Sequence, residues 1–437
     1  MGLAQEQVWR RSLRAADKPP LYNETITVYR RGPLEVIVLE QCFAEILRRH
    51  EAWRSSFNLG SSQPVQVIHP APLAVKIPVV DLRDLPGKER EAEATSLASE
   101  QAQQPFDPLQ GPLLRPLLLK MDDTSYRFIV IAHQCIVDGV SVYQVFPTEL
   151  AALYEAFSAG TASPLPELKI QYSDFARWQR QGLQGETRDQ QFAYWRKQLA
   201  GELPVLQWPR MDTRPSGESC RGVIHSFTSP SGFAEMVKNF GHEQGATLFM
   251  VLLAGFTALL HIYTGQNDIL VGTLSPAGRK RSEVQGLLGY FLNPVALRYA
   301  FTAESTFRDL LLETRRLISE AISNDDVPLE VVAERLNLKS SRDPFVKVAV
   351  SLQPQVPTVE SGWNVTSMDA QSGGTVWDFY LAFIEGELGL QGRAQYNPDI
   401  FEEVVIRAML EDLRKVIGSG ISDPARRVKY LLQRNDH

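Results

Sequence analysis

An apolar segment in the first third of the chain runs directly into a cluster of polar residues. Residues 128–132 are all apolar, as expected for a strand that is buried on both faces. The polar and turn-forming residues that follow are His133, Gln134, Asp138, Gly139 and Ser141. We expect Ser141 to cap a helix that runs to about Glu155. Polar side chains at the end of a buried strand stand on a rigid base, so this segment is the first candidate for a functional site.

Length and charge limit the class of protein. A chain of 437 residues is longer than one hydrophobic core usually supports, so we expect two lobes. An apolar content of 44% and a charged content of 22% are typical of a soluble globular protein. The net charge of −6 argues against nucleic-acid binding, which needs clustered Lys and Arg.

Cysteine usage and hydropathy predict a reduced, cytoplasmic setting. The three cysteines, Cys42, Cys135 and Cys220, include no CxxC pair and are too few for a disulfide framework. No apolar run approaches the ~20 residues of a membrane-spanning helix, and the N-terminus lacks the pattern of a signal peptide. The sequence also has no P-loop, GxGxxG, GxSxG or HExxH motif. We therefore expect no metal, no nucleic acid and no membrane as partners.

The polar cluster resembles a family signature. His133-Gln134-Cys135-Ile136-Val137-Asp138-Gly139 is similar to the His-His-x-x-x-Asp-Gly motif of condensation domains from nonribosomal peptide synthetases. Gln134 stands where that family has its second histidine, the one assigned to catalysis. With this signature, seven blocks follow the family pattern in order; the others are residues 3–9, 49–57, 172–179, 278–279 with 286–293, 325–330 and 342–345. The resemblance covers almost the entire chain.

The resemblance implies an α/β (α+β) fold of two chloramphenicol-acetyltransferase-like lobes that form a V-shaped pseudo-dimer. The first lobe would span residues 1–178 and hold the signature loop. The second would span residues 179–437, with a bridging helix that begins near residue 172 and crossover elements near 286–293 and 376–388. The end of the chain, residues 431–437, has no core pattern and is expected to be a linker cut from a larger polypeptide.

The family also implies the partners. Donor and acceptor carrier proteins would bring phosphopantetheine-tethered substrates into a tunnel, and an adenylation domain would adjoin this domain in the same polypeptide. No intrinsic cofactor is implied. The synthetase would be purely peptide-forming or a hybrid with a polyketide synthase. The predicted tunnel residues are Tyr290, Asn293, Gln353 and Trp377.

Asp138 and His133 are predicted to support the site. By resemblance, Asp138 pairs with Arg279 across the lobes, and a carboxylate that faces a guanidinium stays ionised and is a poor base. His133 is expected to point into its lobe, because alternation in a strand sends it away from its neighbour Gln134. Both assignments describe structure rather than catalysis.

Gln134, Gly139 and Ser141 are predicted to lie closest to the chemistry. The backbone N–H of Gly139 and the start of the helix near Ser141 can meet negative charge on a thioester oxygen, although a turn alone would also explain the glycine. The Gln134 amide can accept a hydrogen bond from an amine, but it does not titrate. The sequence is therefore compatible with an enzyme that works by positioning, and with a non-catalytic module that recruits or gates partner proteins.

Two other residues are candidate reactive groups. Cys135 shares a strand face with His133, but a cysteine beside Ile136 and Val137 is more often a small buried hydrophobe. His50 follows an amphipathic helix and is expected at a solvated helix end, since nothing near it in the sequence completes a site.

Overall fold

The computed structural model describes residues 1–15, 18–59, 64–208, 220–338, 345–357, 362–365, 370–386 and 389–432. The chain forms two compact units. The first contains Met1–Leu183, Pro276–Leu292 and Gln353–Gly374, and the second contains Gln184–Ser275, Asn293–Leu352 and Thr375–His437. The predicted mixed α/β class is confirmed. The compact units do not correspond to the two predicted lobes, since each unit contains three separate segments. The predicted lobe boundary after residue 178 therefore stays a prediction.

The first unit is built on a five-stranded sheet with the order β11-β1-β6-β5-β4. Its strands are β1 (Asn23–Arg31), β4 (Val79–Asp81), β5 (Leu114–Lys120), β6 (Ser125–His133) and β11 (Trp363–Val365). The central strand β6 is antiparallel to both β1 and β5. Every residue of β6 after Ser125 is buried, so the predicted buried strand is confirmed.

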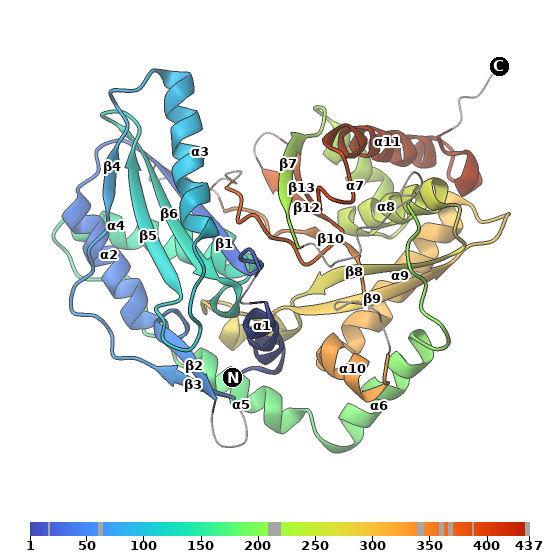
Figure 1. The fold of residues 1–437 in the computed structure, drawn as a ribbon, viewed down its shortest axis with the longest axis horizontal. Coiled ribbons are helices and arrows are strands. Elements are labelled where there is room, and N and C mark those ends of the chain that lie inside the picture. The colour runs from blue at the N-terminus through green and yellow to red at the C-terminus, as the bar shows by residue number, and fades with distance from the viewer. Residues whose placement is uncertain are drawn as a thin grey trace. The chain divides into compact units, whose positions relative to one another are not determined.

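Helices cover both faces of this sheet (Figure 1). The helices of the unit are α1 (Leu3–Arg14), α2 (Val36–Arg49), α3 (Gly87–Gln103), α4 (Phe146–Ser158) and α5 (Tyr172–Gly182), with short turns η1 (Glu51–Arg54), η2 (Gln134–Ile136), η3 (Ser141–Val145), η4 (Ala277–Arg279) and η5 (Ser282–Val284). A small hairpin joins β2 (Ser55–Leu59) to β3 (Pro64–Ile68). On one face Phe128 meets Phe43 of α2 and Phe146 of α4 edge to face or tilted, which anchors both helices.

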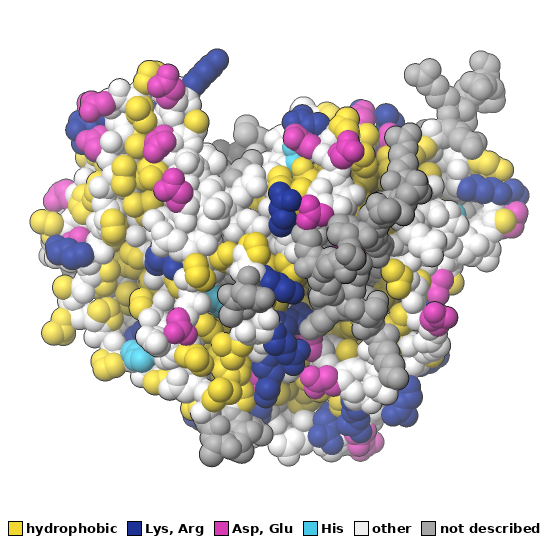
Figure 2. Space-filling view, in the orientation of Figure 1, with side chains coloured by type: hydrophobic (Ala, Val, Ile, Leu, Met, Phe, Trp, Pro, Cys, Tyr) yellow, Lys and Arg dark blue, Asp and Glu magenta, His cyan; other side chains and the backbone are white. Residues whose placement is uncertain are grey.

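On the other face, α3 packs through three alanines. Ala94, Ala98 and Ala102 are fully buried against Ile129 and Ile131 of β6. Their spacing of four places them on one side of the helix, and their small size allows close approach to the sheet. The opposite side of α3 is exposed and acidic, as Figure 2 shows; its carboxylates include Glu89, Glu91, Glu93 and Glu100.

The second unit holds a six-stranded mixed sheet with the order β7-β13-β12-β10-β8-β9. Its strands are β7 (Val223–Thr228), β8 (Asp268–Ser275), β9 (Asn293–Ala300), β10 (Val348–Leu352), β12 (Phe379–Gly386) and β13 (Gly389–Tyr396). Its helices are α6 (Gly185–Gln198), α7 (Phe233–Glu243), α8 (Leu248–Thr264), α9 (Phe307–Ser323), α10 (Leu329–Arg335) and α11 (Glu403–Ser422), and η6 (Val428–Tyr430) follows. Most of α8 is buried, as its nearly continuous apolar sequence predicts.

The predicted bridging helix is wrong in one respect, because it is two helices. α5 ends at Gly182 and α6 begins at Gly185. Gly185 has a φ of 59°, a left-handed conformation that glycine adopts without a steric cost. The division between the two compact units falls in this break, between Leu183 and Gln184.

The predicted crossover element near residues 376–388, the motif at residues 342–345 and the end of the chain are described in part. Residues 375–386 belong to the second unit, whereas the preceding segment Gln353–Gly374 belongs to the first. Parts of two predicted motifs, residues 342–344 and 387–388, lie outside the described residues, as do the last five residues, 433–437.

The described helices were compared with membrane-spanning helices by length and apolar composition. No single one is long and apolar enough to cross a bilayer, although the bent pair of α7 and α8 together meets the same criterion by length and composition.

Candidate functional site

His133, the last residue of β6, is turned into the first unit. Its ring is buried, with Nε2 3.0 Å from Ser12 Oγ and Nδ1 accepting the backbone N–H of Cys135 at 3.2 Å. Since Nδ1 accepts, the ring proton is on Nε2, which donates to Ser12. Burial lowers the pKa of His133 to about 4. A neutral, hydrogen-bonded ring of this kind fits the predicted supporting role.

Gln134 occupies a different environment. It begins η2 and is half-buried. Its backbone N–H donates to Tyr22 O at 2.7 Å, which continues the pairing of β1 with β6 by one residue. Its side-chain Nε2 lies 3.4 Å from Oε1 of Glu24. The backbone of this residue is therefore fixed while its amide remains accessible.

Asp138, rather than Ser141, caps the following helix. The helical conformation begins at Gly139, and Asp138 Oδ1 accepts the N–H of Ser141 at 2.8 Å. The predicted Ser141 cap is wrong because Ser141 lies inside the first turn. The helix continues through the π-turn η3 into α4. Pro147, which has no backbone N–H to donate, lies just after this π-turn.

The expected ion pair of Asp138 with Arg279 is present. Arg279 Nε lies 2.7 Å from Oδ2 and Nη2 lies 2.8 Å from Oδ1, and the Asp138 and Arg279 side chains are 0% and 3% exposed. Such a bidentate geometry is the strongest form of this contact. Segment Pro276–Leu292 brings Arg279 into the same compact unit as Asp138, and the expectation that the pair crosses between lobes stays a prediction.

Arg279 also organises the segment that carries it. Its Nη1 donates to the carbonyl oxygens of Val284 and Gln285 at 3.1 and 3.2 Å. Its Nη2 donates to Leu287 O and to Ser141 Oγ, both at 3.0 Å. The guanidinium carbon lies 4.2 Å from the centre of the Phe291 ring, a favourable cation–π contact.

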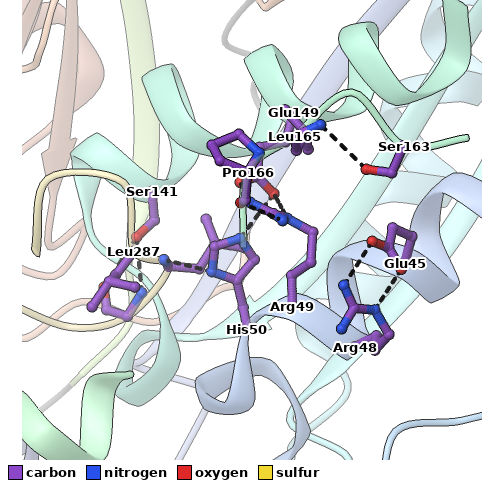
Figure 3. Close-up of polar contacts among 12 residues, drawn as sticks. Glu45, Arg48, Arg49, His50, Ser141, Glu149, Ser163, Leu165, Pro166 and Leu287 are labelled. Carbon is purple, nitrogen blue, oxygen red and sulfur yellow. Dashed lines mark hydrogen bonds and ion pairs between the residues drawn. The ribbon is translucent and has the colours of Figure 1, made fainter. Parts of the chain in front are cut away.

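Three more side chains bind successive backbone groups of residues 288–290. Ser141 Oγ donates to Gly289 O at 3.1 Å and accepts Gly289 N–H at 3.0 Å. His50 Nδ1 accepts Leu288 N–H at 3.2 Å, and Tyr172 donates to Tyr290 O at 2.7 Å. Figure 3 shows His50 and Ser141 beside this segment. These contacts satisfy backbone groups that would otherwise be left without partners. We call residues 284–290 the held loop.

The environment of His50 was missed at the sequence level. His50 is 1% exposed, and its Nε2 lies 2.9 Å from Oε2 of Glu149. Arg49 Nη2 contacts Oε1 of the same carboxylate at 3.0 Å (Figure 3). Burial alone would raise the pKa of Glu149, but the hydrogen bonds and charges of His50 and Arg49 lower it below its ordinary value. The solvated helix end predicted for His50 is therefore wrong.

Gly139 allows a close backbone approach. A Cβ atom at this position would lie 2.6 Å from Gln353 Oε1 and 3.1 Å from Pro354 Cδ. Its φ is not among the positive values of the described backbone, so the space rather than the turn requires glycine. Within the described residues the N–H of Gly139, at the start of the helix, has no backbone partner.

The predicted tunnel residues are divided between the units. Tyr290 and Gln353 belong to the first, and Asn293 and Trp377 to the second. Asn293 is buried, and its Nδ2 donates to Asp325 O and Val327 O at 2.6 and 2.9 Å. The half-buried Trp377 stacks on Tyr380 with ring centres 6.2 Å apart. Their role in a tunnel stays a prediction.

Cys135 is not placed for nucleophilic chemistry. The strand ends at His133, and Cys135 lies in the short η2 turn, where it is fully buried. Burial raises the pKa of its thiol well above the ordinary value, and a thiol rather than a thiolate is inert. Among the residues that the structure describes, no group of three His, Cys, Asp or Glu side chains could hold a metal ion.

Comparison with known proteins identifies the family. The sequence matches the condensation domain over residues 2–436, and the chain therefore belongs to the condensation-domain family of nonribosomal peptide synthetases. It is 38% identical over 94% of its length to a linear gramicidin synthase polypeptide of Brevibacillus parabrevis, and 35% identical over 93% to a chondramide synthase of Chondromyces crocatus. The chain spans only 5% and 10% of those two proteins.

Solved structures share the fold. The first condensation domain of the calcium-dependent antibiotic synthetase, in complex with a substrate analogue, has a TM-score of 0.84 at 20% identity, with 98% of each chain covered. The X-domain from teicoplanin biosynthesis has a TM-score of 0.82 at 24% identity, covering 98% of this chain and 96% of that one. The chloramphenicol-acetyltransferase-like α/β fold expected from the resemblance is confirmed.

We predict that Arg279→Ala destabilises the protein strongly. Removing the guanidinium leaves Asp138 buried and unpaired, which costs about 3–5 kcal/mol. Arg48→Ala is the matched control, because Arg48 pairs with Glu45 and Glu167 at the surface and such pairs contribute at most about 1 kcal/mol. Urea unfolding followed by tryptophan fluorescence measures both. Equal losses would show that the buried pair is not the main support.

Ser141→Ala should loosen the held loop without unfolding the unit. The variant removes the hydroxyl that binds both backbone groups of Gly289, so amide hydrogen exchange in residues 284–290 should become faster. Ser163→Ala is the control, since among the described residues the Ser163 hydroxyl accepts a single 3.4 Å contact, from the N–H of Leu165. Unchanged exchange in the loop would contradict the contact network.

His133 should make stability depend on pH. Its folded pKa of about 4 lies below the ordinary value of 6.5, so the unfolded chain binds the proton first as the pH falls. The contribution is complete above about pH 6.5 and is lost as the pH falls toward 4, by up to about 3 kcal/mol. His133→Gln should show a smaller loss over this range in urea unfolding at several pH values. Parallel profiles would contradict the neutral buried ring.

Proposed function

We propose that this chain forms an amide bond between a carrier-bound acyl or peptidyl thioester and a carrier-bound aminoacyl amine. The family match supports the reaction class. The observation that supports it most at the site is the buried bidentate pair of Asp138 with Arg279, in the signature segment that also carries Gln134. The ion pair fixes the segment that follows β6, and the half-buried Gln134 lies directly after the last residue of that strand.

In the proposed reaction, the amine nitrogen attacks the thioester carbon and the carbon–sulfur bond breaks. The amine loses one proton and the departing thiolate gains one. Gln134 cannot take that proton, but its Oε1 can accept a hydrogen bond from the amine and orient it. General-base help typically contributes ~10²–10⁴ in rate, whereas positioning can contribute more. The proposed enzyme therefore works by positioning and is slower than one with histidine.

The supporting residues take separate roles in this proposal. The N–H of Gly139 stands at the start of a helix and can stabilise the thioester oxygen as it becomes negative. Ser141 is fully buried, and its hydroxyl is occupied by Gly289 and Arg279. We therefore assign Ser141 to holding the loop rather than to the chemistry.

Partners follow from the same proposal. The chain is a small fraction of the gramicidin and chondramide synthases, and it also resembles one part of a four-domain nonribosomal peptide synthetase, of which it covers 34% at a TM-score of 0.81. We propose donor and acceptor carrier proteins as partners, each bringing its own phosphopantetheine arm. An adenylation domain would adjoin this domain in the same polypeptide, and no further cofactor is needed.

A non-catalytic module that recruits or gates partners is the second candidate. Gln134 favours it, because this side chain lacks the proton chemistry of histidine. A protein of the same fold, the X-domain from teicoplanin biosynthesis, forms a complex with OxyB. That complex supports protein binding as the second candidate role.

The test supplies loaded donor and acceptor carriers and compares the parent chain with Gln134→His and Gln134→Ala. We expect product from the parent, about 10²–10⁴ times more turnover from the histidine variant, and the least from alanine. Mass spectrometry of the carrier-bound product measures each rate. Product from the histidine variant alone would show a catalyst that glutamine disables, and product from none would support the non-catalytic module.

A further inference from the structure

Glu24 lies beside Gln134 because of the register of two strands. β1 and β6 pair so that Glu24 stands opposite Ala132 and Asn23 opposite His133. Gln134 follows by one more step, with its N–H bonded to Tyr22 O. Glu24 and Gln134 are therefore diagonal neighbours across the pair, a separation that long side chains can bridge. His133 projects to the opposite side of the strand.

The contact between them gives the Gln134 amide a direction. Nε2 of Gln134 donates to Oε1 of Glu24 at 3.4 Å, and a carboxylate can only accept. The nitrogen of the amide is thereby turned toward Glu24, and its oxygen is turned away. Within the described residues no hydrogen bond reaches Oε1 of Gln134. Glu24 is exposed and Gln134 is half-buried, so this oxygen is available to a ligand.

We propose that Glu24 is a positioning residue that holds the Gln134 amide so that its Oε1 accepts the N–H of the acceptor amine. The inference rests on the proposed amide-forming function. A free amide rotates and presents its NH₂ group as readily as its oxygen, and an NH₂ group facing the amine would donate to the lone pair that must attack the thioester. A carboxylate behind the NH₂ group removes that alternative and makes the glutamine a fixed acceptor.

Two backgrounds separate positioning from a general effect of charge. With Gln134 present, Glu24→Ala should lower kcat by about three- to tenfold, as expected for the loss of one exposed hydrogen bond of ordinary strength, with a smaller change in KM. Glu24→Gln keeps an accepting oxygen and should retain at least half of the rate. With Gln134→Ala, Glu24→Ala should have no further effect. Glu100→Ala, an exposed carboxylate on α3, is the control for lost charge.

Several results would overturn the inference. These are a loss no larger than in Glu100→Ala, an equal loss in both backgrounds, or a loss in Glu24→Gln as large as in Glu24→Ala.

A structural measurement distinguishes this failure from failure of the proposed reaction. In ¹⁵N-labelled protein, the side-chain NH₂ protons of Gln134 should exchange with water faster in Glu24→Ala than in Glu100→Ala. If no variant makes product but this difference is present, the amide-forming function is wrong and the positioning contact stands. If exchange is unchanged, Glu24 does not hold the amide, whatever the turnover.

Discussion

The buried ion pair of Asp138 with Arg279 is the contact on which the rest of the first unit's site depends. Two buried charges are costly unless each meets an opposite charge and its remaining hydrogen-bonding groups are satisfied. Here both conditions hold, because Asp138 also accepts the N–H of Ser141 and Arg279 also binds the carbonyl oxygens of the held loop. One pair thereby joins the end of β6, the start of the next helix and segment Pro276–Leu292.

The held loop shows how an irregular segment can be buried. Its carbonyl and N–H groups would be costly without partners. Arg279, Ser141, His50 and Tyr172 satisfy them one after another. His50 is in turn fixed by Glu149, which Arg49 also contacts. These side chains belong to motifs far apart in the sequence, and all of them bind the backbone of the same loop.

Gln134 and His133 are neighbours with opposite environments. Burial keeps His133 neutral, with its pKa lowered, and bound to Ser12, so the histidine of the signature is turned into the first unit. Gln134 keeps an accessible amide with Glu24 behind it. The consequence is a site in which hydrogen-bond direction, rather than proton transfer, is what the side chain at this position can supply.

The sequence by itself determined the buried strand β6, the buried helix α8, the α/β class, and the pairing of Asp138 with Arg279. The buried strand and the buried helix are visible because burial leaves continuous apolar runs. The α/β class and the ion pair were expected because the sequence motifs resemble those of condensation domains. Only the tertiary structure decided that Asp138 caps the helix, that α5 and α6 are separate, and that Glu149 fixes His50. The contact of Glu149 with His50 joins residues separated by 99 in the sequence, which no local pattern records. The Asp138 cap and the break at Gly185 are local, but they depend on backbone conformations that the residue types alone leave open.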